Sequence, residues 1–202
     1  MKKLPPRAEH LRRALAQEAA RIMAEHGVRD FLLAKRKAAE RYGVVDGSLL
    51  PRNTEIEAAL QEYQRLFGGE SHVETLQGQR AVALDVMHRL QRFQPRLVGP
   101  VLTGTATPHD DVVLHVFVDR IETLSFDLMD QGVPHETGER RIRLDADRTA
   151  QQPTIRLEVD DQPVELVVFN IDGIRQAPIS PVDGKPMRRA DLREVEGLLA
   201  TD

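Results

Sequence analysis

The sequence contains no cysteine and no tryptophan, and aromatic residues make up only 4% of its 202 residues. The absence of cysteine excludes disulfide bonds, thiolate zinc sites and a cysteine nucleophile. The scarcity of aromatic side chains argues against a surface on which the bases of single-stranded nucleic acid would stack. We therefore expect a core of aliphatic side chains and a function that needs neither thiol chemistry nor an aromatic platform.

Long apolar runs are absent as well. Residues 1–6 are not followed by the apolar stretch of a signal peptide, and no run approaches the roughly 20 apolar residues that span a bilayer. Hydrophobic residues nevertheless make up 41% and charged residues 30% of the chain, which is typical of a globular protein. We expect a cytoplasmic protein without a membrane partner, and the lack of cysteine fits a reducing compartment.

Charge is distributed unevenly along the chain. The net charge is −4, but residues 1–70 are slightly basic and residues 71–202 are acidic. A basic region can meet an anionic partner, although neither part has the strong positive charge of a dedicated nucleic-acid-binding protein. The side chains that could contact a nucleotide or RNA are Lys35, Arg36, Lys37, Arg188 and Arg189. The alternative is that Lys35, Arg36 and Lys37 form a solvated helix face and that Arg188 and Arg189 belong to a loop that positions the last helix. A protein partner is a further candidate.

Apolar residues at three- and four-residue spacing predict a helical N-terminal region, residues 1–70, and a long helix at the start of a second domain, residues 71–202. The predicted helices cover residues 8–26, 31–42, 55–67 and 71–93. Gly27 is placed to end the first helix. Capping boxes are expected at Thr54 with Glu57 and at Ser71 with Glu74.

After Pro95 the pattern changes to short β-branched segments. We expect a strand that includes Val98, Val101 and Leu102, then a loop, and then a buried strand over residues 112–118. The remaining predictions are a helix capped by Asp119 and Glu122, a strand at 140–144, a hairpin of strands 154–159 and 164–169, a loop at 171–189 and a helix at 189–199. Because strands follow strands, the fold class is α+β and not a doubly wound parallel sheet.

The stretch 97–116 holds the most informative pattern. An apolar segment leads into Gly99, a turn of small residues with Gly104 and a Thr-Pro step follows, and Asp111 opens the next apolar strand. This pattern resembles the motif of polymerase-beta-type nucleotidyltransferases. The resemblance covers roughly residues 80–170 and implies a nucleotidyltransferase-like mixed or antiparallel sheet with flanking helices.

The resemblance also implies site residues. Members of the family transfer a nucleotidyl group with Mg²⁺ ions held by clustered carboxylates, because hard oxygen ligands suit this ion. Asp111 corresponds to the first metal carboxylate and Glu165 to the third, so both are candidate catalytic and metal-binding residues, with Mg²⁺ the cofactor of an active enzyme. The candidate nucleotide-binding residues of the glycine turn are Gly99, Gly104 and Thr105.

Two residues depart from the family pattern. Pro100 stands where Ser or Gly is expected, and it offers neither a backbone N–H nor a hydroxyl. Val113 stands where the second carboxylate is expected, and it cannot bind Mg²⁺. Both departures fall on functional positions, which indicates a degenerate active site more than a different fold.

His115 adds a further candidate catalytic residue. It lies four residues after Asp111, so the period of a strand places both on one face. His115 could complete a metal or phosphate site with Asp111 and Glu165, since imidazole also binds transition metals. The alternative is a hydrogen-bonded core histidine. Asp110 could pair with Asp111 only if it still lies in the turn, because adjacent strand residues face opposite ways.

A second resemblance concerns the segment Gly27–Arg41. It is similar to the N-terminal region of a family of proteobacterial proteins that pair it with a nucleotidyltransferase-like part. This family brings no established activity with it, so it extends the resemblance along the chain without assigning a reaction.

Three functions remain open at this point. The first is a non-catalytic nucleotidyltransferase-like protein that binds a nucleotide, RNA or a protein partner, as Pro100 and Val113 favour. The second is an active metal-dependent nucleotidyltransferase, whose nucleotide binding would depend on Mg²⁺. The third is a helical interaction protein with no nucleotide site, which predicts no stabilisation by any nucleotide.

Overall fold

The computed structural model describes residues 5–145 and 147–201, which form a mixed α+β fold with N-terminal helices preceding a sheet, as expected. The chain divides into two compact units, one mostly of residues up to His72 and the other mostly of residues from Val73 onward. The short segments Thr107–His109 and Pro181–Asp183 belong to the first unit. None of the described helices is both long and apolar enough to cross a membrane.

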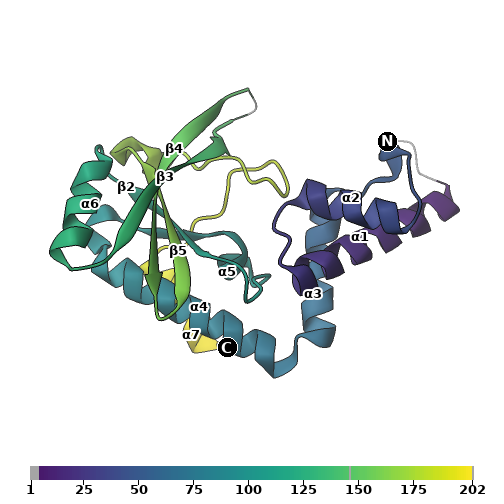
Figure 1. The fold of residues 1–202 in the computed structure, drawn as a ribbon, viewed down its shortest axis with the longest axis horizontal. Helices are drawn as coiled ribbons and strands as arrows, with labels where there is room; N and C mark the ends of the chain where they lie inside the picture. Colours follow the sequence, from purple (N-terminus) through teal and green to yellow (C-terminus); the bar gives the residue numbers. More distant parts are fainter. Residues whose placement is uncertain (1–4, 146, 202) are drawn as a thin grey trace. The chain divides into compact units, whose positions relative to one another are not determined.

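The first unit is a helical bundle (Figure 1). Its core is rich in alanine. Its elements are α1 (Pro6–His26), α2 (Phe31–Arg41), the 3-10 helix η1 (Gly47–Leu49) and α3 (Asn53–Phe67). Small side chains such as Ala19 and Ala34 are fully buried together with Leu15 and Ile56. These small residues let the helices approach closely, so the predicted apolar stripes do meet in one core.

The predicted capping boxes of the helical region are wrong. α3 begins at Asn53, and the carboxylate of Glu55, three residues after Arg52, accepts a hydrogen bond from the Arg52 N–H at 2.6 Å. The same carboxylate accepts a bond from Arg12 Nε at 2.9 Å, a contact across 43 residues that local spacing does not reveal. Helix α4 (Gly69–Arg89) already includes Ser71, so Ser71 cannot cap it.

The second unit contains a sheet in which helices separate the first three strands along the chain, whereas the last three strands follow one another directly. Its further elements are η2 (Gln91–Phe93), β1 (Arg96–Val98), α5 (Gly99–Thr103), β2 (Val112–Phe117), α6 (Ile121–Asp130), β3 (His135–Arg143), β4 (Thr149–Val159), β5 (Gln162–Phe169), η3 (Ile171–Arg175) and α7 (Leu192–Thr201). The sheet order is β1-β2-β5-β4-β3. β2 and β5 pair in parallel and the other neighbours are antiparallel, so the sheet is mixed.

The predicted hairpin between β4 and β5 is confirmed. Val159 pairs with Gln162, and the two residues between them, Asp160 and Asp161, both have positive φ angles, 51° and 62°. Asp tolerates this left-handed conformation better than most residues, and a two-residue turn of this kind matches the twist of paired strands. Local turn chemistry was therefore sufficient to fix this pairing.

The region after β1 differs from its prediction, because Val101 and Leu102 lie in the short helix α5 and not in a strand. Pro100 occupies the first turn, where its fixed φ favours a helix start. Gly104 ends the helix with φ 81° and donates its N–H to the Pro100 carbonyl at 2.9 Å. Proline and glycine at these two positions decide the local conformation against the strand preference of the residues between them.

The predicted cap of α6 is also wrong. The helix begins at Ile121 without a side-chain cap, and Asp119 instead accepts a hydrogen bond from the backbone N–H of Ile171 at 3.5 Å. Asp119 therefore links the end of β2 to η3, a contact between residues 52 positions apart that sequence spacing cannot show.

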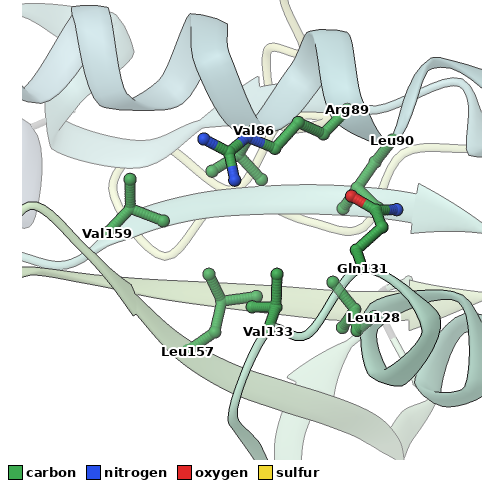
Figure 2. Close-up of a pocket in the computed structure, with 8 residues that line it drawn as sticks. All are labelled: Val86, Arg89, Leu90, Leu128, Gln131, Val133, Leu157 and Val159. Atoms are coloured by element: carbon green, nitrogen blue, oxygen red, sulfur yellow. The ribbon is translucent and has the colours of Figure 1, made fainter.

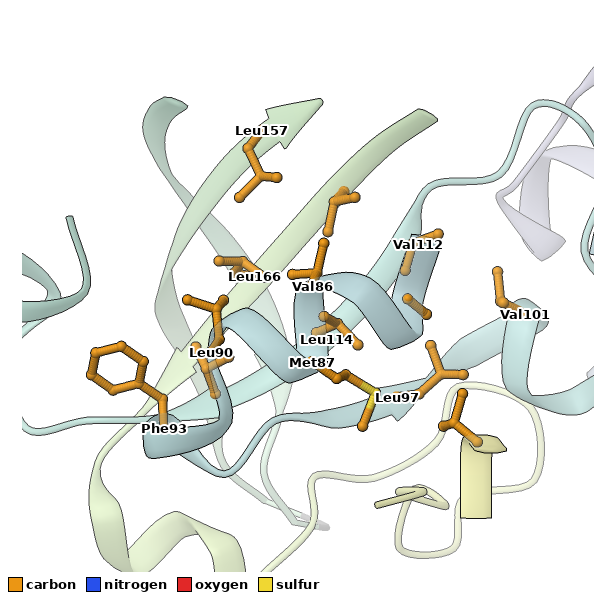
Figure 3. Packing of buried hydrophobic residues seen from close by; sticks show 14 of the residues in the cluster. Val86, Met87, Leu90, Phe93, Leu97, Val101, Val112, Leu114, Leu157 and Leu166 are labelled. Atoms are coloured by element: carbon orange, nitrogen blue, oxygen red, sulfur yellow. The ribbon is translucent and has the colours of Figure 1, made fainter. Parts of the chain in front are cut away.

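The two faces of the sheet are very different. The first face carries Leu114 of β2 and Leu166 of β5 and packs on helices of the unit in one apolar cluster (Figure 3). We call the opposite side the second face. It carries Val113, His115 and Phe117 of β2 and Glu165, Val167 and Phe169 of β5. A smaller apolar cluster on it centres on Phe117, Val167 and Phe169.

Candidate functional site

The parallel pairing of β2 and β5 places two of the predicted positions side by side. Val113 pairs with Glu165, and His115 pairs with Val167 two residues further along. Side chains two residues apart on a strand share a face, so Val113, His115 and Glu165 all lie on the second face. The valine that replaces the expected second carboxylate is therefore the direct neighbour of Glu165.

Glu165 is almost fully buried, but its charge is balanced. Its carboxylate accepts hydrogen bonds from Arg140 on β3 and, at 3.5 Å, from Arg156 on β4. The Glu165 side chain is 6% exposed, whereas Arg140 and Arg156 are 48% and 68% exposed. Two arginines thus cover the carboxylate from the solvent side, in the place where a metal ion would have to approach it.

His115 is buried and neutral. Its Nδ1 accepts a hydrogen bond from Arg189 Nε at 2.9 Å, so Nδ1 is the unprotonated nitrogen. Burial, followed by the charges of Arg189 and Arg140, holds the pKa of His115 well below its usual range. A metal ligand needs an open lone pair, and the only lone pair of neutral His115 already accepts the Arg189 bond. This arrangement matches the core-histidine alternative of the sequence analysis.

Arg189 lies on a small aromatic surface. Its guanidinium carbon is 5.0 Å from the ring centres of both Phe117 and Phe169. Its Nη1 donates to the carbonyls of Gly173 at 2.8 Å and Ile174 at 3.4 Å, in η3. The backbone that carries Arg189 is also fixed, because the next residue, Ala190, exchanges two backbone hydrogen bonds with Leu97 of β1. The predicted last helix accordingly begins at Leu192 and not at 189.

The environment of Arg189 makes its charged form less favourable than it is in water. Burial, together with the charge of Arg96, lowers its pKa to about 10. Arg96 is close because it pairs with His115 across β1 and β2. Since Arg189 still keeps its proton at neutral pH, the part of the second face around His115 is positively charged.

The other candidate residues lie around α5. Gly99 opens this helix with φ 74°, and Gly104 closes it. Thr105 is 4% exposed, and its hydroxyl is 3.0 Å from that of Thr103. Asp111 directly precedes β2 and is partly exposed. Among the described residues no group of three or more His, Asp or Glu side chains is arranged to hold a metal ion.

The basic residues proposed as partner contacts fall in different units. Lys35, Arg36 and Lys37 lie on α2 of the first unit, where Arg36 and Lys37 are exposed. Lys35 is partly buried, and this burial lowers its pKa, while Glu55 acts in the opposite direction. Arg188 is exposed and Arg189 half-buried in the second unit. Within each predicted contact, neighbouring residues therefore differ in burial: Lys35 differs from Arg36, and Arg189 differs from Arg188.

An apolar hollow lies away from the second face (Figure 2). It is lined by Val86, Arg89, Leu90, Leu128, Gln131, Val133, Leu157 and Val159. Its free volume of about 10 Å³ has room for about one water molecule and not for a nucleotide. The hollow is a packing feature between α4, α6 and β4, and we do not assign it a ligand.

Sequence reasoning missed the arginines Arg96, Arg140 and Arg156, which surround the predicted site. One signal was present. Glu165 is the single charged residue within the apolar run of residues 164–169, and a buried charge requires a partner. The identity of the partner depends on the register of β3, β4 and β5, which brings Arg156 opposite Glu165.

Comparison with family models, with curated proteins and with solved structures gives no significant match to this chain. The resemblance of residues 80–170 to nucleotidyltransferases therefore stays a prediction, and the contacts of the second face carry the functional interpretation.

Proposed function

We propose that this chain is a nucleotidyltransferase-like protein that binds a nucleotide on the second face of the sheet without transferring a nucleotidyl group. The sequence pattern around Gly99, Gly104 and Asp111 supports the family relationship. The contacts of Glu165 support the loss of catalysis. The arginines on the same face support an anionic ligand.

The observation that carries the proposal is the double ion pair of Glu165. A carboxylate that holds Mg²⁺ must offer its charge and its oxygens to the ion. Arg140 and Arg156 already bind these oxygens, and Val113 beside them has no ligand atom. Two-metal phosphoryl transfer requires clustered carboxylates to neutralise and orient the phosphates. On the second face, arginines occupy this position instead.

Positive charge on the second face supports a nucleotide over an uncharged ligand. Arg140 and Arg156 flank Glu165, and Arg96 and Arg189 flank His115. The register also places Glu136 beside Arg156 on this face, so the unbalanced positive charge lies around His115, where Arg189 has no carboxylate partner among the described residues. Guanidinium groups bind phosphate oxygens through two parallel hydrogen bonds. Phosphate charge could be neutralised here without a metal ion.

Thermal unfolding of the purified protein with ATP, CTP, GTP or UTP tests this function, with each nucleotide measured in Mg²⁺ and in a chelator. We expect at least one nucleotide to stabilise the protein equally under both conditions. A ligand at 100 times its dissociation constant adds roughly 2.7 kcal/mol to the free energy of unfolding. Arg13→Gln, at an exposed position of α1, is the control variant and should respond like the wild type.

Two results would contradict the proposal. Stabilisation that requires Mg²⁺, together with release of pyrophosphate, would indicate an active nucleotidyltransferase. No stabilisation by any nucleotide in either condition would remove nucleotide binding, and the helical interaction hypothesis would then be preferred.

A further inference from the structure

Arg189 carries a charge that no carboxylate balances among the described residues. Its hydrogen bonds go to His115, which is neutral, and to the backbone carbonyls of Gly173 and Ile174. The remaining nitrogen, Nη2, is shielded from solvent and has no hydrogen-bond partner. The charge that acts on the pKa of Arg189, besides burial, is that of Arg96, which is also positive.

This arrangement differs from the normal environment of a half-buried arginine. Charges removed from water are paired with an opposite charge or satisfied by a full set of hydrogen bonds, because desolvation is otherwise too costly. Glu165 on the same face is bound to Arg140 and Arg156. The described residues therefore supply no counter-ion for Arg189, and a bound anion would provide one.

We propose that Arg189 is the centre of a metal-independent binding site for the phosphate group of a phosphomonoester, with Arg96 and Arg140 beside it. The inference rests on the proposed function, since it names the part of the nucleotide that the second face recognises. The class of ligands that this site could bind is wider than nucleotides, because any phosphomonoester presents the same phosphate group.

The chemistry of the site favours phosphate over a carboxylate. A phosphomonoester carries close to two negative charges near neutral pH and three strong acceptor oxygens. These match several guanidinium groups, whereas one carboxylate would leave positive charge unbalanced. The neighbouring charges on His115 come from Arg189 and Arg140, and Arg96 is its strand neighbour. The charges of Arg140 and Arg96 therefore act near Arg189, although Arg140 also binds Glu165 and Arg96 donates to the carbonyls of Gln94 and Pro95.

Binding must also change the contact between Arg189 and His115. Since Nη2 is shielded, an anion reaches it when the guanidinium turns outward from the aromatic surface of Phe117 and Phe169. The bond from Nε to His115 Nδ1 would then lengthen or break. The imidazole ¹⁵N chemical shifts of His115 therefore report directly on occupancy of the site.

The test is a titration with inorganic phosphate, AMP and adenosine in the presence of a chelator, followed by calorimetry and by the ¹⁵N shifts of His115. We expect phosphate and AMP to bind and to move the His115 signals, and adenosine alone to have no effect. Arg189→Gln should weaken phosphate binding roughly tenfold or more, because a charged hydrogen-bond donor is lost. Arg141→Gln, an exposed arginine that alternates with Arg140 on β3 and so points to the other side of the sheet, should bind like the wild type.

Arg96→Gln is the second variant, in case Arg189→Gln does not fold. Removing this charge relieves repulsion on Arg189, so folding stability should stay equal or rise, while phosphate binding weakens. If Arg189 had only a structural role, Arg96→Gln would not combine unchanged or higher stability with weaker phosphate binding. Arg189→Lys, which keeps the charge but loses the planar fork, should bind more weakly than wild type and more tightly than Arg189→Gln.

The outcomes separate this inference from the proposed function. Nucleotide binding that is unchanged in Arg189→Gln, or adenosine binding as tightly as AMP, would overturn the phosphate site and leave nucleotide binding intact. Phosphate binding that depends on Arg189, with no gain from the nucleoside part, would support the site and contradict a nucleotide ligand. Absence of phosphate and AMP binding to the wild type would overturn the inference.

Discussion

The two faces of the sheet in the second unit use the same strands for different purposes. Along β2, Leu114 and Val116 face the helices and are fully buried in the large apolar cluster. Val113, His115 and Phe117 alternate with them and face Glu165 and the arginines. The first face stabilises the folded unit through the burial of apolar side chains. The second face places buried polar groups and charges in costly environments, which is where binding sites are found.

The largest expected effect comes from truncating the first face. Leu114→Ala should lower the free energy of unfolding by about 2–5 kcal/mol, because it removes a fully buried side chain and leaves a cavity. Val113→Ala, its neighbour on the second face, should cost only about 1 kcal/mol. Urea denaturation of both variants measures the difference. Equal losses would mean that the second face is as closely packed as the first.

Removing both arginines that bind Glu165 should have the next largest effect. Arg140→Gln with Arg156→Gln leaves the carboxylate buried and uncompensated, which should cost about 2 kcal/mol after allowing for the exposure of both arginines. Arg141→Gln, at the adjacent exposed position of β3, is the control and should change little. Denaturation at neutral pH measures both. A stable double variant would show that Glu165 does not need these partners.

Restoring the expected second carboxylate gives a smaller effect. Val113→Asp places a negative charge beside Glu165, which should lower stability by up to about 1 kcal/mol relative to the uncharged Val113→Asn. Mg²⁺ should leave the melting temperatures of Val113→Asp and Val113→Asn equally unchanged, because Arg140 and Arg156 already occupy the Glu165 carboxylate that would have to share the ion. Calorimetric scans with and without Mg²⁺ measure this. A rise in the melting temperature of Val113→Asp alone would show that the arginines do not block a metal site.

The smallest predicted effect is the pH dependence contributed by His115. In the unfolded chain His115 takes up a proton near pH 6.5, whereas burial beside Arg189 and Arg140 keeps it neutral in the folded state until a much lower pH. Unfolding therefore takes up a proton below pH 6.5, and stability is lost as the pH falls.

His115→Asn provides the comparison, because it keeps an acceptor for Arg189 Nε but does not titrate. Stability curves of the two proteins from pH 7.5 down to pH 5, roughly one unit either side of an ordinary histidine pKa, should diverge below pH 6.5. Both proteins contain all the other histidines, so the difference between their stability curves comes from His115 alone. Parallel curves would indicate that His115 titrates in the folded protein as it does in the unfolded chain, which would contradict the lowered pKa.

Sequence patterns predicted the elements of the fold better than their ends and their contacts. The hairpin at Asp160 and Asp161 and the buried strand β2 follow from local turn chemistry and from an unbroken β-branched run. The helix α5 was missed because the residues between Pro100 and Gly104 prefer strands, while the two flanking residues decide the conformation. Asp119 was misassigned because its partner, Ile171, is far away in the chain.

For the site, the sequence determined which side chains could share a face, because strand residues alternate with a period of two. It therefore placed Val113 and His115 on one face of β2, whereas the position of Glu165 beside Val113 depends on the parallel pairing of β2 with β5. Only the tertiary structure decided what meets them. Arg140 and Arg156 reach Glu165 through the register of β3, β4 and β5, and Arg189 reaches His115 from 74 residues away. Such contacts depend on long-range pairing, which local propensity does not encode, and they turn a predicted carboxylate site into an arginine-lined surface.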